Sequence, residues 1–187
     1  MQTEIIMKKI NIFLILILLI SGCSASKKLT QYQKTSYDSG FDTAIILLAY
    51  TENEDQFNTY FAQMESEFVK YNAYFDKYHT YEHVNNLKTI NDNAGKTPVV
   101  VDQILIDLLL EAKTYYTISN GSFDITMGSV LNVWHDYREA AILENEFNPV
   151  GPVPSLQELQ QANQSTGWQY LEIDDDTNTV YLTNPKT

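Results

Sequence analysis

Hydrophobic residues recur at strand or helix spacing along most of the chain, and the pattern predicts an α+β fold. Phe41–Tyr50 is apolar and rich in β-forming residues, which predicts a buried strand. Thr51–Glu54 has the residue pattern of a capping box and is expected to start a helix. That helix carries apolar side chains three or four positions apart, which we expect to face the core. They are Phe57, Phe61, Met64, Phe68, Tyr71 and Phe75.

A second helix and a short strand are predicted in the middle of the chain, after an irregular polar segment. Val99–Val101 has the composition of a strand, and Asp102 is a candidate N-cap for the helix that follows. Gly121 is expected to end this helix in the left-handed conformation. The chain then passes through Trp134, which we expect in the core, into a segment that we expect to be irregular.

The last thirty or so residues predict a short helix and a hairpin. Ser155 and Glu158 have capping-box spacing, which predicts a helix to about Gln164. Residues 170–174 and 179–182 alternate between apolar and polar on either side of a turn sequence, which predicts two paired strands. No internal repeat or second domain is evident, and about 150 residues suffice for a single core.

Residues 1–22 are predicted to be a lipoprotein signal peptide. A short basic stretch precedes an apolar run over residues 10–20. That run is shorter than the roughly 20 apolar residues needed to span a bilayer, and it fits the apolar part of a signal peptide. Ile20-Ser21-Gly22-Cys23 resembles a bacterial lipobox, in which small residues precede a thiol that receives a diacylglyceryl group. The alternative is an ordinary signal peptide that happens to contain a cysteine.

Cys23 is the only cysteine of the sequence, which favours its lipidation. A lipidated Cys23 leaves no thiol for a disulfide, a nucleophile or a zinc site. Residues 23–34 are polar and are expected to form a flexible tether between the lipid and a domain at 35–187. We therefore expect the protein at the cell membrane, lipid-anchored on its extracytoplasmic face.

The charge of the chain excludes one large class of partner. The sequence has 12 basic and 24 acidic residues, a formal net charge of −12 at pH 7. Such a chain repels phosphate backbones, so we expect no nucleic-acid binding. An anionic cofactor would also be repelled unless a cation lies between it and the protein.

One short motif suggests a different chemistry. His79-Thr80-Tyr81-Glu82-His83 matches the H-x-x-E-H pattern of inverted zinc peptidases, which requires a helix to bring both imidazoles to one zinc ion. The flanking residues are rich in tyrosine and asparagine rather than in strong helix formers. This favours the alternative, in which both histidines are exposed in an active-site loop.

Four blocks of the sequence, taken in order, resemble the ApbE family of FAD:protein FMN transferases, in particular its lipoprotein members from Gram-positive bacteria. The first is Phe41-Asp42-Thr43, and the second is Phe75-Asp76-Lys77-Tyr78 with Asn86-Leu87-Lys88-Thr89-Ile90-Asn91. The third and most specific is Gly121-Ser122-Phe123-Asp124-Ile125-Thr126-Met127-Gly128, and the fourth is Val130-Leu131-Asn132-Val133-Trp134. Together they cover residues 36 to about 138.

The resemblance implies an ApbE-like, T-fold-related mixed sheet with packed helices. It also implies a magnesium-dependent transfer of FMN from FAD to a Thr or Ser of a target flavoprotein subunit in a membrane electron-transfer complex. The FAD contacts that it implies are Phe41, Tyr78, Ser122, Phe123 and Asp124.

Each of these contacts has a structural alternative. Phe41 and Tyr78 suit a hydrophobic core equally well, and Asp124 suits a cap for the turn into Val130. Nearby, Thr126 is expected to be a β-branched strand residue. Arg138 is as consistent with the surface as with a pyrophosphate contact.

The sequence departs from the family pattern in two places. His135-Asp136-Tyr137-Arg138 replaces the usual Gly-Phe-Gly. The family's Asp-x-Gly-x-x-Ala-Lys-Gly, Ser-x-Ser-Gly and His-Ile-x-x-Pro segments, which supply magnesium ligands and acid/base groups, do not occur. We therefore expect a C-terminally truncated copy, whose catalytic and metal residues would lie beyond Thr187. A non-catalytic lipoprotein that binds flavin or a partner, or an inactive remnant, is the alternative.

Overall fold

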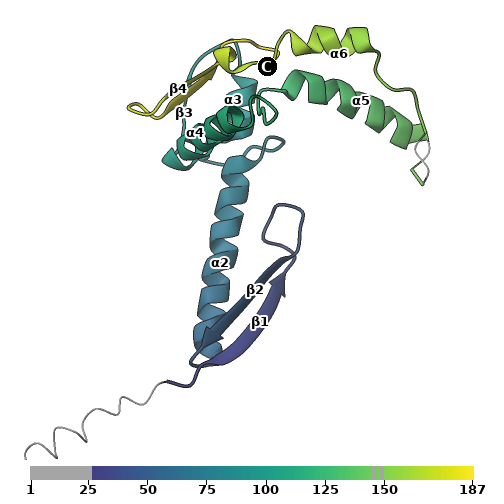
Figure 1. Cartoon of the computed structure of the whole chain (residues 1–187). Coiled ribbons are helices and arrows are strands. Elements are labelled where there is room, and N and C mark those ends of the chain that lie inside the picture. The colour runs from purple at the N-terminus through teal and green to yellow at the C-terminus, as the bar shows by residue number, and fades with distance from the viewer. Residues whose placement is uncertain (1–26, 145, 148–149) are drawn as a thin grey trace, which may run out of the picture. The chain divides into compact units, whose positions relative to one another are not determined.

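The computed structural model describes residues 27–144, 146–147 and 150–187, which form two compact units (Figure 1). The predicted signal peptide and Cys23 lie outside the described residues. The first unit takes in residues up to Asp38 and Asp42–Glu65, and the second takes in Ser39–Phe41 and Ser66–Thr187. One long helix, α2 (Glu54–Phe75), contributes to both units.

The first unit is a two-stranded hairpin with the N-terminal part of α2. Strands β1 (Thr30–Ser36) and β2 (Ile45–Thr51) pair antiparallel. In this unit the Tyr32 ring stacks on Phe57 with centroids 5.5 Å apart, and the Lys34 ammonium lies 4.3 Å from the Phe61 ring centroid. Both phenylalanines are buried. The flexible tether predicted to reach Lys34 is wrong over residues 30–34, because these residues pair with β2.

Two expected boundaries in this unit are also wrong. The strand predicted from Phe41 begins at Ile45, because Phe41 and Asp42 have φ of 59° and 48° and so cannot continue a strand. The capping residue of α2 is Asn53 rather than Thr51, since Asn53 Oδ1 accepts a hydrogen bond from Gln56 N at 2.9 Å. Thr51 is instead the last residue of β2.

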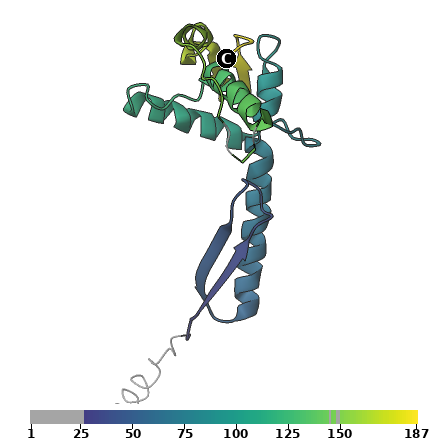
Figure 2. The same ribbon diagram turned by 90° about the vertical axis from the view of Figure 1, so that its right-hand side faces the viewer.

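The second unit has a compact core between a three-stranded sheet and two helices (Figure 2). The sheet is antiparallel in the order β3 (Val99–Val100), β5 (Thr179–Leu182), β4 (Leu171–Asp174). Helices α3 (Leu87–Asp92) and α4 (Gln103–Ile118) supply the other side of the core. The core residues are Ile90, Ala94, Val99, Val101, Leu105, Ile106, Leu109, Val180 and Leu182.

Local signals in this unit are largely confirmed. Asp102 Oδ1 accepts from Ile104 N at 3.0 Å and caps α4. The capping box of Ser155 and Glu158 begins α6 (Leu156–Asn163), and the predicted hairpin is β4–β5. Gly121 has the expected left-handed conformation with φ of 81°, although α4 ends earlier, at Ile118. A short 3₁₀ helix, η1 (Trp168–Tyr170), precedes β4.

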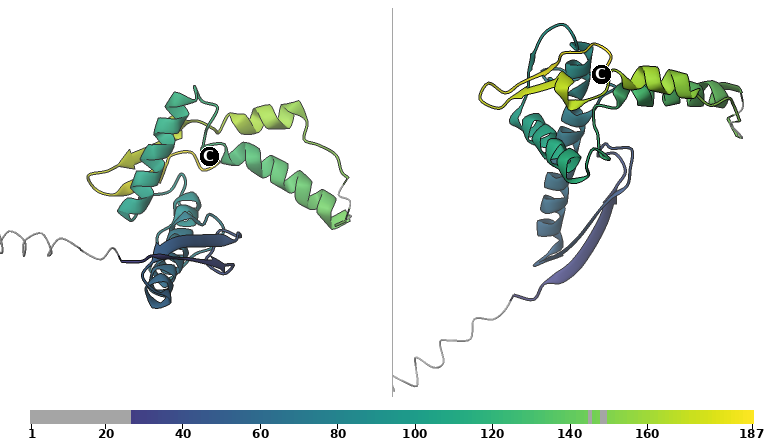
Figure 3. Two further views of the ribbon diagram at one scale, coloured as in Figure 1. Left: turned by 60° about the horizontal axis from the view of Figure 1, so that its bottom comes forward. Right: turned by 45° about the horizontal axis from the view of Figure 1, so that its top comes forward.

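The segment expected to be irregular after Trp134 is helical as far as Glu144, whereas residues 150–155 are irregular as expected. Helix α5 runs over Gly128–Glu144 and packs beside α6 (Figure 3). Its last turns consist of good helix formers, and neither glycine nor proline interrupts them. No residue of α5 is buried, and Trp134 is 45% exposed, so its placement in the core is wrong.

The apolar side chains spaced three or four apart along α2 are only partly buried. Phe57 and Phe61 are buried, whereas Phe68 and Tyr71 are 36% and 38% exposed. The periodicity predicted the helix and its apolar face, but burial depends on what covers that face. Within the described part of the chain, no helix combines the length and apolar character needed to cross a bilayer.

Candidate functional site

The loop that joins α4 to α5 holds Ser122, Phe123 and Asp124, all predicted FAD contacts. Its first part is fixed by the end of α4, where Gly121 N donates to Tyr116 O at 2.9 Å and Phe123 N donates to Ser119 Oγ at 2.9 Å. The Phe123 ring lies edge-on to Tyr115, with centroids 6.1 Å apart, and remains 46% exposed. Ser122 is also exposed. The loop therefore presents an aromatic ring and a hydroxyl on a fixed backbone.

Asp124 and Thr126 tie this loop to a distant part of the second unit. Asp124 Oδ1 accepts from Thr126 N at 2.8 Å and from Thr126 Oγ1 at 2.7 Å. Thr126 Oγ1 in turn accepts from Gly167 N at 2.7 Å. Asp124 therefore caps the turn, as the structural alternative predicted, and it does so through Oδ1. The strand expected at Thr126 is wrong, since this residue is a buried connector in a turn.

Phe41 lies against the part of α2 that belongs to the second unit. Its ring is 6.1 Å from Phe68 and 6.5 Å from Phe75, centroid to centroid, and its N–H donates to Asn72 Oδ1 at 2.9 Å. Gly40 makes this approach possible, because a Cβ there would lie 2.6 Å from Asn72 Cβ. With 42% of Phe41 exposed, the plain-core alternative does not describe it.

Tyr78 belongs to a turn built around Asp76, a carboxylate to which the sequence patterns assigned no role. Asp76 lies one residue beyond α2, and its side chain is only 10% exposed. It accepts from Tyr78 N at 2.6 Å, His79 N at 3.1 Å, His79 Nδ1 at 2.8 Å and Tyr81 OH at 2.9 Å. An aspartate directly after a helix, followed by N–H donors, was the available signal.

The charge of Asp76 is stabilised by these donors. Burial alone would raise the pKa of the carboxyl, but the hydrogen bonds from Tyr78, His79 and Tyr81 outweigh it and lower the pKa to about 2. The hydrogen bond that the Tyr81 hydroxyl donates to Asp76 also raises the pKa of that hydroxyl. Tyr78 itself stays 64% exposed, which argues against a core role for its ring.

Asn86 holds the far end of this turn in place. It is fully buried, and its Nδ2 donates to His79 O at 2.8 Å and to Ala73 O at 3.0 Å. Its Oδ1 accepts from Thr89 N at 3.0 Å, which caps α3. One side chain therefore links the end of α2, the turn and the start of α3.

The zinc-peptidase hypothesis is wrong. The segment from His79 to His83 is not helical, and His83 has φ of 62°. The two imidazoles have different partners, since His79 Nδ1 meets Asp76 and His83 Nε2 lies 3.2 Å from Glu82 Oε1. Across residues 27–144, 146–147 and 150–187, no group of three or more His, Cys, Asp or Glu is arranged to hold a metal ion.

The predicted contacts thus form two groups within the second unit. Ser122, Phe123 and Asp124 share the α4–α5 loop. Phe41 and Tyr78 lie near the end of α2, where Phe41 contacts Phe75 and Tyr78 is bonded to the adjacent Asp76.

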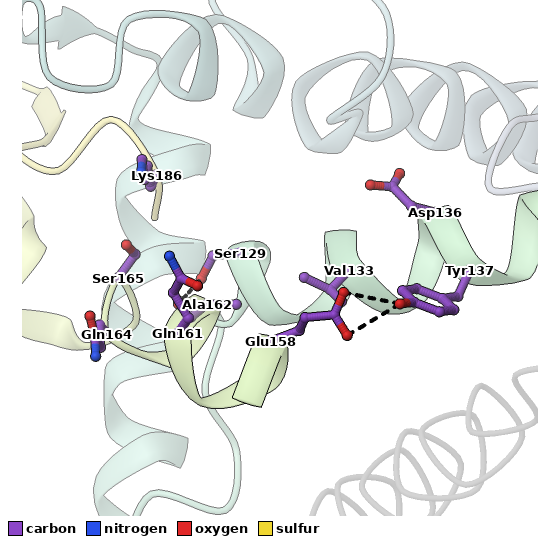
Figure 4. A pocket seen from close by; sticks show the side chains of 10 residues that line it. All are labelled: Ser129, Val133, Asp136, Tyr137, Glu158, Gln161, Ala162, Gln164, Ser165 and Lys186. Carbon is purple, nitrogen blue, oxygen red and sulfur yellow. Dashed lines mark hydrogen bonds between the residues drawn. The ribbon is translucent and has the colours of Figure 1, made fainter. Parts of the chain in front are cut away.

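A pocket of about 480 Å³ is lined mainly by residues of α5 and α6 (Figure 4). It is lined by Ser129, Val133, Asp136, Tyr137, Glu158, Gln161, Ala162, Gln164, Ser165 and Lys186. Tyr137 OH donates to both carboxylate oxygens of Glu158, at 3.0 and 3.2 Å, which raises the pKa of the tyrosine. None of the five predicted FAD contacts lines this pocket.

Comparison with known proteins gives one consistent result. The ApbE family model matches residues 40–187. An FAD:protein FMN transferase of Chlamydia pneumoniae is 23% identical over 177 residues, which is 92% of this chain and 50% of that protein. An FAD:protein FMN transferase of Chlamydia muridarum is 26% identical over 101 residues, or 54% of this chain and 29% of the other.

Solved structures agree in fold. The ApbE protein of Thermotoga maritima has a TM-score of 0.63 and 22% identity over 83% of this chain and 46% of its own. The apo flavinyl transferase ApbE of Pseudomonas stutzeri has a TM-score of 0.62 and 17% identity over 84% of this chain and 46% of its own. These likenesses confirm an α+β, ApbE-like fold. The chain spans about half the length of these relatives.

Proposed function

This chain belongs to the ApbE family, and from that premise we propose that it forms the N-terminal part of an FAD:protein FMN transferase domain with FAD as its substrate. The match over residues 40–187 carries the proposal, because it includes every predicted FAD contact. In the proposed reaction a Thr or Ser hydroxyl of a target protein attacks the FAD pyrophosphate. A phosphoester bond to FMN forms and the bond to AMP breaks.

The geometry of the α4–α5 loop supports flavin binding by this part of the domain. Phe123 offers an exposed ring, and aromatic rings stack favourably on planar heterocycles. Asp124 and Thr126 hold the loop through hydrogen bonds that reach Gly167, so the ring is presented without a large ordering cost. Ser122 adds an exposed hydroxyl beside it.

Magnesium belongs to the proposed reaction of the complete domain, where it would neutralise charge on the phosphoryl oxygens. We propose that its ligands come from outside the described residues, among which no group of three or more His, Cys, Asp or Glu is arranged to hold a metal ion. In this proposal the residues of this chain contribute flavin contacts, and the rest of the domain contributes the metal site.

The proposal is tested by titrating the full chain with FAD and measuring the flavin fluorescence. We expect saturable quenching of flavin emission, weakened several-fold by Phe123→Ala, because the variant loses the stacking ring. Leu143→Ala is the matched control, since Leu143 is 87% exposed at the end of α5 and lies outside the loop. Equal affinities for the two variants, or no FAD binding at all, would contradict the proposal.

A second candidate function is flavin binding without transfer. The exposed Phe123 ring and Ser122 hydroxyl favour it, because both can contact a flavin without any transfer step. Incubation with FAD, Mg²⁺ and a threonine-bearing target protein distinguishes the two, because only the transferase leaves flavin covalently on the target. Transfer by this chain without Mg²⁺ would contradict the role proposed for the metal.

We further propose that Cys23 is lipidated and anchors the domain to the extracytoplasmic face of the cell membrane, near a membrane redox target. The lipobox-like Ile20-Ser21-Gly22-Cys23 supports this. Cells grown with labelled palmitate should label the chain, and Cys23→Ser should abolish the label and release the protein from the membrane fraction. Ser26→Ala is the control, and label that persists in Cys23→Ser would contradict lipidation.

A further inference from the structure

The turn after α2 holds an exposed histidine more firmly than a surface side chain requires. The His79 side chain is 76% exposed, yet its Nδ1 lies 2.8 Å from the buried carboxylate of Asp76. Its backbone N–H also donates to Asp76, and its carbonyl accepts from Asn86 Nδ2. Backbone and ring are therefore both fixed, although the ring itself faces solvent.

The partner atom determines which nitrogen of His79 carries the proton. Asp76 is ionised at neutral pH, since hydrogen bonds lower its pKa to about 2, and an ionised carboxylate only accepts. In the neutral ring Nδ1 must therefore be the donor, and Nε2 is then the unprotonated nitrogen that can accept a hydrogen bond. In the described part of the chain, no hydrogen bond from another residue reaches Nε2. Asp76 thus fixes both the orientation and the tautomer of the ring, as carboxylates do behind functional histidines.

The neighbours of His79 provide the other elements of a nucleotide contact. Tyr78 is 64% exposed, and its ring centroid lies 6.5 Å from that of His79. The Lys77 ammonium lies 4.8 Å from the Tyr78 ring centroid. An exposed ring flanked by an ammonium and a fixed imidazole matches a ligand that is planar, polar at its edge and negatively charged.

We propose that Asp76 positions the His79 imidazole as a polar contact for a nucleotide whose ring lies on Tyr78, with Lys77 near its phosphate. The inference rests on the proposed function in taking FAD as that nucleotide. Asp76 acts through His79 and is a positioning residue. The contrasting case is His83, which lies in the same segment with an 89% exposed side chain and, within the described part of the chain, pairs with its neighbour Glu82 alone.

The competing explanation is that Asp76 only organises the turn. Its bonds to Tyr78 N, His79 N and Tyr81 OH would achieve that without the imidazole. Under this explanation the ring of His79 is incidental, and its replacement has no effect on a ligand.

The test uses the full chain labelled with ¹⁵N-histidine, whose ring correlations report tautomer and ligand contact. The sequence has three histidines, so His83→Gln and His135→Gln assign the His79 signals. We expect the Nδ1–H tautomer for His79, and a shift of its Nε2 signal when FAD is added while the His83 signals stay in place. His79→Gln should weaken FAD binding about fivefold, the loss expected for one hydrogen bond, whereas His83→Gln should not.

Asp76→Asn tests whether Asp76 acts by positioning the His79 ring. It should shift the His79 ring toward the Nε2–H tautomer and weaken FAD binding about as much as His79→Gln. If the His79 ring of the ligand-free wild-type chain is mainly the Nε2–H tautomer, the inference is wrong. If FAD binds and His79→Gln binds it equally well, this inference fails while the proposed function stands. If FAD does not bind the wild-type chain, both fail.

Discussion

The sheet-and-helix core of the second unit and the helix pair α5–α6 contain similar apolar residues but bury them very differently. In the core, Leu105, Ile106 and Val180 are fully buried. Along α5, Leu131 and Trp134 are 53% and 45% exposed, and no residue of the helix is buried. The difference teaches that an apolar side chain stabilises a structure only when other elements cover it, because the hydrophobic gain scales with the area removed from water.

The largest expected effect breaks the core itself. Leu105→Ala should lower the free energy of unfolding by about 2–5 kcal/mol, because it removes buried methyl groups and leaves a cavity. Leu131→Ala on α5 should change it by less than about 0.5 kcal/mol. Chemical denaturation of both variants checks the contrast, and equal losses would show that α5 is covered in solution.

The next largest effect concerns Asn86, which is as deeply buried as the apolar core but polar. Asn86→Ala should cost about 2 kcal/mol or more, because the carbonyls of Ala73 and His79 lose their donor and α3 loses its cap. Asn91→Ala, at an exposed position on the same helix, is the control. Denaturation midpoints should separate the two variants, and matching midpoints would mean that the Asn86 network does not stabilise the fold.

A smaller effect is expected where the α4–α5 loop is tied to Gly167. Thr126→Val keeps the shape of the side chain but removes the hydroxyl that bonds Asp124 and Gly167, which should cost about 1–2 kcal/mol. Thr126→Ser retains both bonds and should lose less. Hydrogen exchange at Gly167 N–H provides a local readout. Unchanged exchange in Thr126→Val would rule out this connection.

The last expected effect is the pH dependence of the stability that Asp76 contributes, because its carboxyl has a lower pKa in the folded than in the unfolded chain. The folded pKa is about 2, below the ordinary 3.8, so the unfolded chain binds more protons between these values. The contribution of Asp76 is therefore present above pH 4 and is lost as the pH falls toward 2. The stability gap between wild type and Asp76→Asn should narrow over that window in pH-resolved denaturation. A constant gap would contradict the pKa shift.

The second unit was predicted from the sequence most accurately where the signals are local. Asp102 as a cap, Ser155 with Glu158 as a capping box, Gly121 in a left-handed turn and the β4–β5 hairpin are all decided by a few neighbouring residues. The family blocks belong to the same class of information, because they are read from the order of residues. For that reason the sequence alone carries the ApbE resemblance.

The site was predictable only in part, since its residues are connected by contacts distant in sequence. The family block drew attention to Ser122, Phe123 and Asp124, but the bond from Gly167 to Thr126 joins residues 41 positions apart. Asp76 lies within a family block, and its place after a helix was a signal for its bonds to the following N–H groups, but its bonds to the His79 ring and Tyr81 depend on how the turn folds back. The H-x-x-E-H pattern requires a helix that the chain does not form, and the two exposed histidines agree with the alternative that the flanking residues favoured.

The sequence by itself determined the helices and strands with strong local signals, the net negative charge and the family. Only the tertiary structure decided which apolar faces are covered, that α2 contributes to two compact units, and that Asp76 holds His79 in place. The physical reason is that caps, turns and periodicity act through neighbouring residues. Burial and the environment of a charge instead depend on residues brought together from distant parts of the chain.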